Sequence, residues 1–170
     1  MDLTGFLAIA VIVVLAIVLL RASFTKVPRE ANWTVERLGR FNRVLTPGLH
    51  FVVPIVERIG ARLDMRETAL DVPPQRATTR DNAEVEAGAV LGYRIVDAVK
   101  ATYEVADLQP ALIQLVGTHM RDVTATRTIA ELATDRAAVN VALLQGVEPA
   151  ADAWGVKVSR LELKGIMLPD

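Results

Sequence analysis

The chain has 170 residues, of which 19 are basic and 20 acidic, so its formal net charge at pH 7 is −1. This balance gives no overall basic field and argues against nucleic acid as a partner. The sequence contains no cysteine, which excludes disulfides, thiolate nucleophiles, thiolate metal sites and palmitoyl anchors.

Residues 3–20 form an uncharged apolar run, LTGFLAIAVIVVLAIVLL. A helix of this length rises about 27 Å, close to the roughly 30 Å hydrocarbon core of a bilayer, so the run predicts a transmembrane helix. A signal peptide is disfavoured because Arg21-Ala22-Ser23 matches a small-x-small cleavage site poorly. A buried helix of a soluble core is disfavoured because the run has no polar face. We therefore expect an anchor with its flank over residues 1–25 and one globular domain over residues 26–170.

Basic side chains follow the apolar run, whereas Asp2 precedes it, so the bulk of the chain is expected in the cytoplasm. Phe24 and Trp33 lie among these cations and fit the depth of lipid headgroups. The residues that we predict to contact the membrane are Leu3, Phe6, Ile9, Val13, Ile17, Leu20, Arg21, Phe24, Lys26, Arg29, Trp33, Phe51, Val52, Val53 and Ile55.

Two β-rich stretches follow the anchor, at residues 33–38 and 41–45, with Gly39 between them. They predict two strands before a turn at Thr46-Pro47-Gly48. The apolar run over residues 49–53 either forms a buried strand or lies against the membrane beside the anchor. The pattern leaves both interpretations open.

The clearest strand pattern lies beyond a predicted turn at Arg80-Asp81-Asn82. Its apolar residues occupy alternate positions, and they are Val85, Ala87, Ala89, Leu91, Tyr93 and Ile95. A period of two predicts a strand with one buried face.

Helical periodicity begins after Asp107, a residue typical of an N-cap, and lasts for about eighteen residues. Thr128 and Glu131 have the spacing of a capping box and predict the start of another helix. Gly146 and Pro149 fall within that helical stretch. Because proline in a helix interior costs about 3 kcal/mol, we expect a break between Gly146 and Ala150.

A last strand is predicted from Trp154 onward, and a change of phase at Ser159-Arg160 predicts a β-bulge within it. The order of an apolar helix, strands, helices and a closing strand predicts an α+β fold.

No group of residues predicts catalysis or a cofactor. His50 and His119 lack further ligands at metal-binding spacing, and Ser23 and Ser159 lie outside a nucleophile-elbow context. The glycines show no phosphate-binding spacing. We therefore predict no catalytic, cofactor-binding or metal-binding residues and no enzyme.

Four strings of the sequence resemble the stomatin/prohibitin/flotillin superfamily, also called SPFH or band 7. They are Val35-Glu36-Arg37-Leu38-Gly39-Arg40-Phe41, Thr46-Pro47-Gly48-Leu49-His50-Phe51-Val52-Val53-Pro54, Leu70-Asp71-Val72-Pro73-Pro74-Gln75 and Trp154-Gly155-Val156-Lys157-Val158. Their order is similar to that of the bacterial stomatin-like, or paraslipin, branch.

The resemblance implies antiparallel strands with helices packed on one side, anchored at the N-terminus and facing the cytoplasm at the inner (plasma) membrane. It implies a scaffold without enzymatic activity that forms large homo-oligomers on membrane lipid and organises membrane patches. Integral-membrane proteases or an NfeD-like protein are the implied partners. Family members continue past the position of Pro169 into a coiled-coil helix, whereas this sequence ends at Asp170. The alternative functions are a lipid-binding adaptor that does not oligomerise and a regulatory subunit of a membrane protease.

Overall fold

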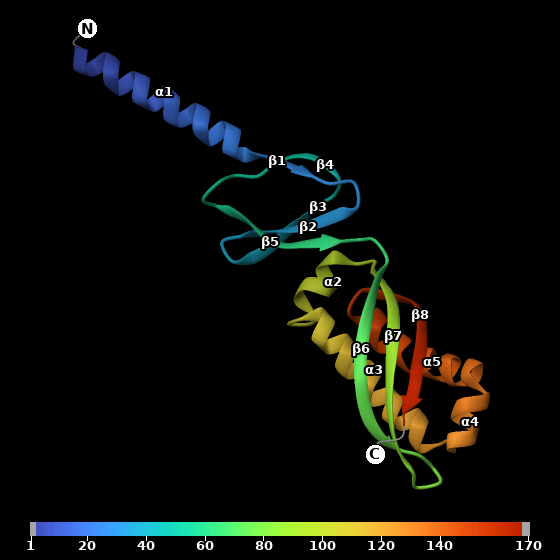
Figure 1. The fold of residues 1–170 in the computed structure, drawn as a ribbon. Coiled ribbons are helices and arrows are strands. Elements are labelled where there is room, and N and C mark those ends of the chain that lie inside the picture. Colours follow the sequence, from blue (N-terminus) through green and yellow to red (C-terminus); the bar gives the residue numbers. More distant parts are fainter. Residues whose placement is uncertain (1–2, 168–170) are drawn as a thin grey trace. The chain divides into compact units, whose positions relative to one another are not determined.

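The computed structural model describes residues 3–167, and the chain divides into two compact units, Met1–Asp64 and Met65–Asp170 (Figure 1). We call them unit 1 and unit 2. Unit 1 holds one long helix and two small sheets, whereas unit 2 holds a three-stranded sheet and shorter helices.

Unit 1 begins with helix α1, after which its described residues form strands. These elements are α1 (Leu3–Ser23), β1 (Phe24–Val27), β2 (Ala31–Arg37), β3 (Arg40–Leu45), β4 (Gly48–Phe51) and β5 (Glu57–Asp64). β1 and β4 pair as an antiparallel two-stranded ribbon, and the other strands form an antiparallel sheet in the order β3-β2-β5. The two strands predicted on either side of Gly39 are thus confirmed as β2 and β3.

The core of unit 1 lies between the ribbon and the three-stranded sheet. Val27, Val35, Leu45 and Val52 are buried together, and Trp33 packs against them. Val27 belongs to the ribbon and Val52 directly follows it, whereas Val35 and Leu45 come from the sheet. One face of the ribbon therefore packs on the core of unit 1, and the other face is exposed.

The prediction of a transmembrane helix is wrong. Residues 3–20 are helical within α1, but no helix in the described residues 3–167 is long and apolar enough to cross a membrane. The uncharged run covers residues 3–20 and is followed by Arg21, so it lies near the short limit of the roughly 17–25 apolar residues with which helices span a core of about 30 Å. The sequence-based prediction took a run near this short limit as sufficient. The single-pass topology predicted from it loses its basis.

Unit 2 consists of an antiparallel sheet in the order β6-β7-β8, with helices packed against it. Its elements are β6 (Thr68–Thr78), β7 (Glu84–Ile95), α2 (Ala98–Tyr103), α3 (Leu108–Ala125), α4 (Ile129–Thr134), α5 (Arg136–Ala153) and β8 (Val156–Met167). α3 contacts β6 and α5 contacts β8, and Figure 1 shows both helices on the same side of the sheet.

The alternating pattern predicted for β7 is confirmed, because all six apolar residues at alternate positions are buried. The turn at Arg80-Asp81-Asn82 is confirmed between β6 and β7, where Asn82 has a φ of 59°. The bulge in β8 is also confirmed. Gly92 of β7 lies opposite Arg160 and Tyr93 lies opposite Val158, so Ser159 is the extra residue.

Both predicted helix starts are confirmed. α3 begins directly after Asp107, although the Asp107 side chain makes no capping hydrogen bond. α4 has the complete capping box, in which the Thr128 hydroxyl accepts from the Glu131 N–H and the Glu131 carboxylate accepts from the Thr128 N–H.

The predicted break near Pro149 is wrong, since α5 continues from Arg136 to Ala153 with Pro149 inside it. Pro149 is exposed, and its turn is flanked by Val147 and Ala151, which are completely buried. Burial of these side chains offsets the one helical hydrogen bond that proline cannot donate. Gly146 adds to this packing, because a Cβ atom there would lie 2.7 Å from Nδ1 of His119 on α3. Packing between helices therefore overrides the local propensity.

Candidate functional site

The ribbon presents an apolar face. Phe24 pairs with Phe51 across β1 and β4, and Lys26 pairs with Leu49. Directly paired residues and residues two apart share one face of a sheet, so these four side chains lie on the same face. Val27, on the opposite face, is buried in the core of unit 1. We call Phe24, Lys26, Leu49 and Phe51 the ribbon face.

The apolar side chains of the ribbon face are exposed. The exposed fractions are 56% for Phe24, 68% for Leu49 and 48% for Phe51. The two phenylalanine rings form an edge-to-face pair with centroids 5.8 Å apart and planes at 75°. Such a pair fixes ring orientation. Exposed apolar side chains that lie next to one another indicate an interaction surface, whereas single scattered ones do not.

A backbone hydrogen bond connects the ribbon to α1. The backbone N–H of Val52 donates to the carbonyl of Ser23 at 2.8 Å, which joins the end of β4 to the end of α1. Ser23 and Val52 are both buried. The apolar run over residues 49–53 is therefore neither fully buried nor fully exposed, because Leu49, Phe51 and Val53 are exposed, His50 is half-buried and Val52 is buried.

A carboxylate that the sequence analysis missed fixes the connection after β4. Glu57 accepts hydrogen bonds from Arg43 at 3.1 Å, from Asn42 at 2.9 Å and from the Val53 N–H at 3.1 Å. Its side chain is only 7% exposed. Arg43 also donates to the Phe51 carbonyl at 2.6 Å. These residues come from β3, from β5 and from the end of β4 and the loop after it, so no local sequence spacing could have indicated the network.

Two exposed aliphatic residues of unit 1 have left-handed backbone conformations. Leu38 has a φ of 51° and is 82% exposed, and Ile55 has a φ of 77° and is 94% exposed. Positive φ is rare for such side chains, above all for a β-branched one, and costs about 1–2 kcal/mol per residue. The Leu38 N–H donates to the Val56 carbonyl at 3.2 Å and so joins the two turns.

A hollow of about 240 Å³ lies where these turns meet, and it is lined by Glu36, Leu38, Gly39, Ile55, Val56 and Arg58. We call these six residues the Leu38–Ile55 patch. Glu36 and Arg58 are direct cross-strand neighbours in β2 and β5, so the patch carries both signs of charge beside its aliphatic side chains.

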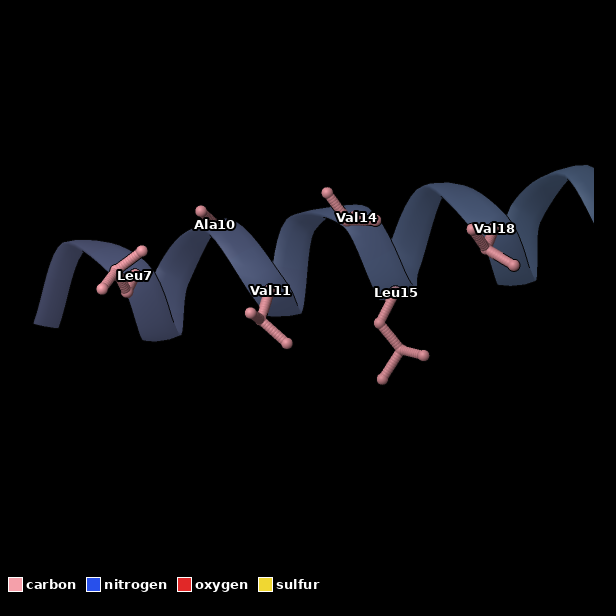
Figure 2. Close-up of a pocket in the computed structure, with 6 residues that line it drawn as sticks. All are labelled: Leu7, Ala10, Val11, Val14, Leu15 and Val18. Carbon is pink, nitrogen blue, oxygen red and sulfur yellow. The ribbon is translucent and has the colours of Figure 1, made fainter. Parts of the chain in front are cut away.

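α1 carries predicted lipid-contacting residues along its length. Val13, Ile17, Leu20 and Arg21 are exposed. Figure 2 shows a row of six further side chains along the viewer's side of the helix, namely Leu7, Ala10, Val11, Val14, Leu15 and Val18. These side chains line a surface of a single helix without a polar group, which gives a small molecule no orienting contact. The side chains of Leu3, Phe6 and Ile9 lie outside the described residues.

The other predicted site residues divide into three groups. The exposed ones are Phe24, Lys26 and Phe51 of the ribbon face, together with Arg29, Val53 and Ile55. Val52 is buried in the core. Trp33 is half-buried, and the guanidinium of Arg62 lies 4.6 Å from its ring centroid, so it packs within unit 1 instead of joining the ribbon face.

Four ionisable groups of unit 2 have shifted pKa values. The hydrogen bond from Thr79 lowers the pKa of Asp81, and the backbone N–H of Thr128 lowers the pKa of Glu131. Ion pairing with Glu86 raises the pKa of Arg76, and ion pairing with Glu148 raises that of Lys157. All belong to unit 2 and are explained by structural contacts. Within the described residues, no cluster of three or more His, Asp or Glu side chains could hold a metal ion.

The fold and the surface together define a small α+β protein with an exposed aromatic ribbon. Residues 25–170 match the profile of the SPFH domain / Band 7 family, and the chain belongs to that family. The sequence-based assignment to the superfamily is thus confirmed.

Relatives from distant organisms share this region. The chain is 37% identical over 143 residues to the human protein named stomatin-like protein 2, mitochondrial. This alignment covers 84% of the chain and 40% of that relative. It is 36% identical over 157 residues to an uncharacterized protein of Archaeoglobus fulgidus, covering 92% and 63% of the two chains. An uncharacterized protein of Mycobacterium bovis is 32% identical over 165 residues, covering 97% and 43%. The chain thus spans about two fifths of the length of the first and last of these relatives.

Proposed function

We propose that this protein is a membrane-associated scaffold without catalytic activity, and that its ribbon face contacts lipid. The observation that carries the proposal is the clustering of Phe24, Leu49 and Phe51, all largely exposed, on one face with Lys26. Aromatic and aliphatic side chains beside a lysine match the composition of a membrane interface, where apolar groups enter the lipid and the cation meets headgroups.

The size of this face sets a weak affinity for each copy. Complete burial of a phenylalanine or leucine side chain is worth about 1.5–3 kcal/mol, and these three expose between 48% and 68% of their surface, so each adds roughly 1 kcal/mol. A lysine near an anionic surface adds about 1 kcal/mol. A total of about 4 kcal/mol corresponds to a millimolar dissociation constant. The ribbon face would therefore act as one contact among several.

Assembly of many copies would turn these weak contacts into stable binding, because each further contact becomes intramolecular once the first has formed. This reasoning favours a scaffold that oligomerises over an adaptor that stays monomeric. The apolar side chains of α1 would add lipid contact to each copy. Membrane proteases and NfeD-like proteins, which the family resemblance implies, remain the proposed partners.

The two units carry opposite net charges, which supports lipid contact through unit 1. Unit 1 has eight basic and five acidic side chains, a net charge of +3, whereas unit 2 has eleven basic and fifteen acidic ones, a net charge of −4. An anionic lipid surface would attract unit 1 and repel unit 2. We therefore expect unit 1 to be the part in contact with lipid.

A fluorescent probe at residue 49 would test lipid contact directly. Because the chain has no cysteine, a Leu49→Cys variant can be labelled at one position with an environment-sensitive fluorophore. We expect a blue shift on vesicles, larger when phosphatidylserine is included. Lys26→Gln should reduce that preference for anionic vesicles about fivefold. Val141→Cys, an exposed position on α5, is the control and should show no shift. A probe at residue 49 that stays in water on vesicles would refute the proposal.

A further inference from the structure

A surface groove lies along helix α3 in unit 2. It has a volume of about 320 Å³ and is lined by Ala111, Gln114, Leu115 and Thr118 of α3 and by Trp154, which directly follows α5. We call these five residues the Trp154 groove. Figure 1 shows α3 and α5 side by side, and the two helices are in contact. The groove therefore combines one face of a helix with an indole ring from the end of the next helix.

The centre of the groove is apolar and only partly covered. Ala111, Leu115 and Trp154 are half-buried. The indole N–H of Trp154 has no hydrogen-bond partner among residues 3–167. Tryptophan is enriched among the residues that dominate protein interfaces, because its ring buries a large area and its N–H can still pair. The small side chain of Ala111 leaves room in the groove for an apolar side chain of a partner.

The groove belongs to a longer stripe of α3 and its N-cap that ends in a carboxylate on each side. A helix turns by about 100° per residue, and the members of the stripe fall within about 100° of its circumference. They are Asp107, Ala111, Gln114, Leu115, Thr118 and Asp122. The two aspartates lie about 22 Å apart along the helix axis. The stripe contains no basic residue, so its charge is purely negative.

Both carboxylates are available to a partner. Asp107 and Asp122 are exposed, and neither forms an ion pair within the part of the chain that the structure describes. Aspartate at an N-cap usually accepts a hydrogen bond from the helix backbone, but the Asp107 side chain accepts none. The Arg121 guanidinium donates to Gln75 of β6 at 2.6 Å and to Thr118 at 3.2 Å, so existing contacts hold this cation on the β6 side of α3.

This charge pattern selects the occupant of the groove. An anionic lipid surface would repel the two carboxylates. A second copy that packed groove against groove would bring the same carboxylates together, because a two-fold contact uses one surface twice. A helix with apolar side chains between cations matches both the apolar centre and the charged ends. Segments rich in lysine and arginine directly flank membrane-spanning helices on one side of the membrane.

We propose that the Trp154 groove binds a basic amphipathic helix of a partner protein, of the kind that flanks a membrane-spanning helix. The inference deepens the proposed scaffold function and rests on it for the partner's location at the membrane. The net charge of −4 on unit 2 would attract such a cationic segment. The groove is smaller than a standard protein interface, so we expect a dissociation constant in the micromolar range or above.

Trp154 itself reports binding. In a Trp33→Phe background it is the only tryptophan of the full chain, which is kept in mild detergent. The probe is a synthetic helix of about four turns with leucines at its centre and lysines at both ends. A comparison peptide has glutamates in place of the lysines. We expect the lysine peptide to shift the Trp154 emission to the blue, and the glutamate peptide to bind at least about tenfold more weakly. Added salt should reduce that difference.

Reversing the charges of the stripe separates recognition from folding. The Asp107→Lys, Asp122→Lys double variant should bind the lysine peptide at least about tenfold more weakly and should instead prefer the glutamate peptide. Loss of folding cannot produce a reversed preference. The matched control is the Glu84→Lys, Glu162→Lys double variant, which reverses two exposed carboxylates of β7 and β8. It should leave both affinities within about twofold of the original values, because exposed charges far from the ligand are screened.

Filling the groove tests its apolar centre. Ala111→Leu places a larger side chain in the groove and retains a good helix former, so it should weaken binding of the lysine peptide at least about tenfold. Ala137→Leu, at an exposed position of α5, is the control and should leave binding unchanged.

Three results would overturn the inference. The first is no response of Trp154 to either peptide, or an equal response to both. The second is a blue shift of Trp154 on vesicles without peptide, which would mean that lipid occupies the groove. The third is a lower mass of the charge-reversed variant in sedimentation equilibrium without any peptide binding, which would mean that a second copy occupies it.

The residue 49 probe distinguishes this inference from the proposed function. If that probe responds to vesicles while neither peptide binds, the inference is wrong and the proposed membrane contact stands. If the lysine peptide binds with the expected preference while the residue 49 probe stays in water, the groove is supported and the proposed membrane contact is refuted.

Discussion

The Arg43 guanidinium and the Glu57 carboxylate lie 3.1 Å apart, and the same guanidinium nitrogen donates to the Phe51 carbonyl at 2.6 Å. The pair thereby connects β3 and β5 to the last residue of β4. Glu57 also accepts from the Val53 N–H, so the chain leaving the ribbon face is fixed by one carboxylate. The exposed face of the ribbon depends on a buried polar group outside it.

Replacing Glu57 with alanine should destabilise unit 1 by about 1–3 kcal/mol, because three donors lose their acceptor in a poorly solvated position. The chain has one tryptophan in each unit, Trp33 and Trp154. In a Trp154→Phe background, urea unfolding followed by Trp33 fluorescence reports unit 1. Arg29→Ala, an exposed position of the same unit, is the control and should cost less than about 1 kcal/mol. Equal losses in the two variants would show that the Glu57 network has no special role.

Gly146→Ala should destabilise unit 2, since the added Cβ would lie 2.7 Å from Nδ1 of His119. Overpacking of this kind typically costs about 1–3 kcal/mol, even though alanine is the better helix former. Trp154 fluorescence in a Trp33→Phe background measures the change. Gly165→Ala is the matched control, because nothing lies within 4 Å of its Cβ position. A stabilising effect of Gly146→Ala would mean that α3 moves away at little cost.

The sequence predicted those elements whose periodicity follows directly from burial. The alternation in β7 and the capping box of Thr128 and Glu131 are local patterns, and both are confirmed. The bulge at Ser159 could also be read from a change of phase. The family was recognised from ordered strings, which depend on no tertiary contact.

Features that depend on contacts between distant segments could not be predicted. The continuity of α5 through Pro149 results from packing against α3 and β8, which no helix propensity describes. Glu57 looked like one of many surface carboxylates, because its three donors approach it only in the fold. The positive φ of Leu38 and Ile55 had no sequence signal, since both are residues that usually avoid it.

Stability of unit 2 should fall in acid, and Asp81 and Glu131 should account for part of the loss. The folded structure lowers the pKa of both carboxyl groups below their ordinary values of 3.8 and 4.5. A lowered folded-state pKa gives stability that is complete above the ordinary pKa and is lost as the pH falls through the folded-state value. The Asp81→Asn, Glu131→Gln double variant should therefore be less stable near neutral pH and show a flatter decline below about pH 4.5. Parallel pH profiles, measured by Trp154 fluorescence, would contradict this assignment.

Pro149→Ala should stabilise unit 2. Pro149 is exposed, so alanine removes no buried contact, and its N–H can donate to the carbonyl of Gln145 four residues earlier. Proline is about 3 kcal/mol less favourable than alanine in a helix interior, so we expect a gain of about 1–3 kcal/mol. Urea unfolding followed by Trp154 fluorescence in a Trp33→Phe background measures it. Val141→Ala, another exposed position of α5, is the control for helix propensity alone and should change stability by less than about 1 kcal/mol. A Pro149→Ala variant no more stable than this control would mean that the Gln145 carbonyl is already satisfied and that α5 carries no cost from its proline.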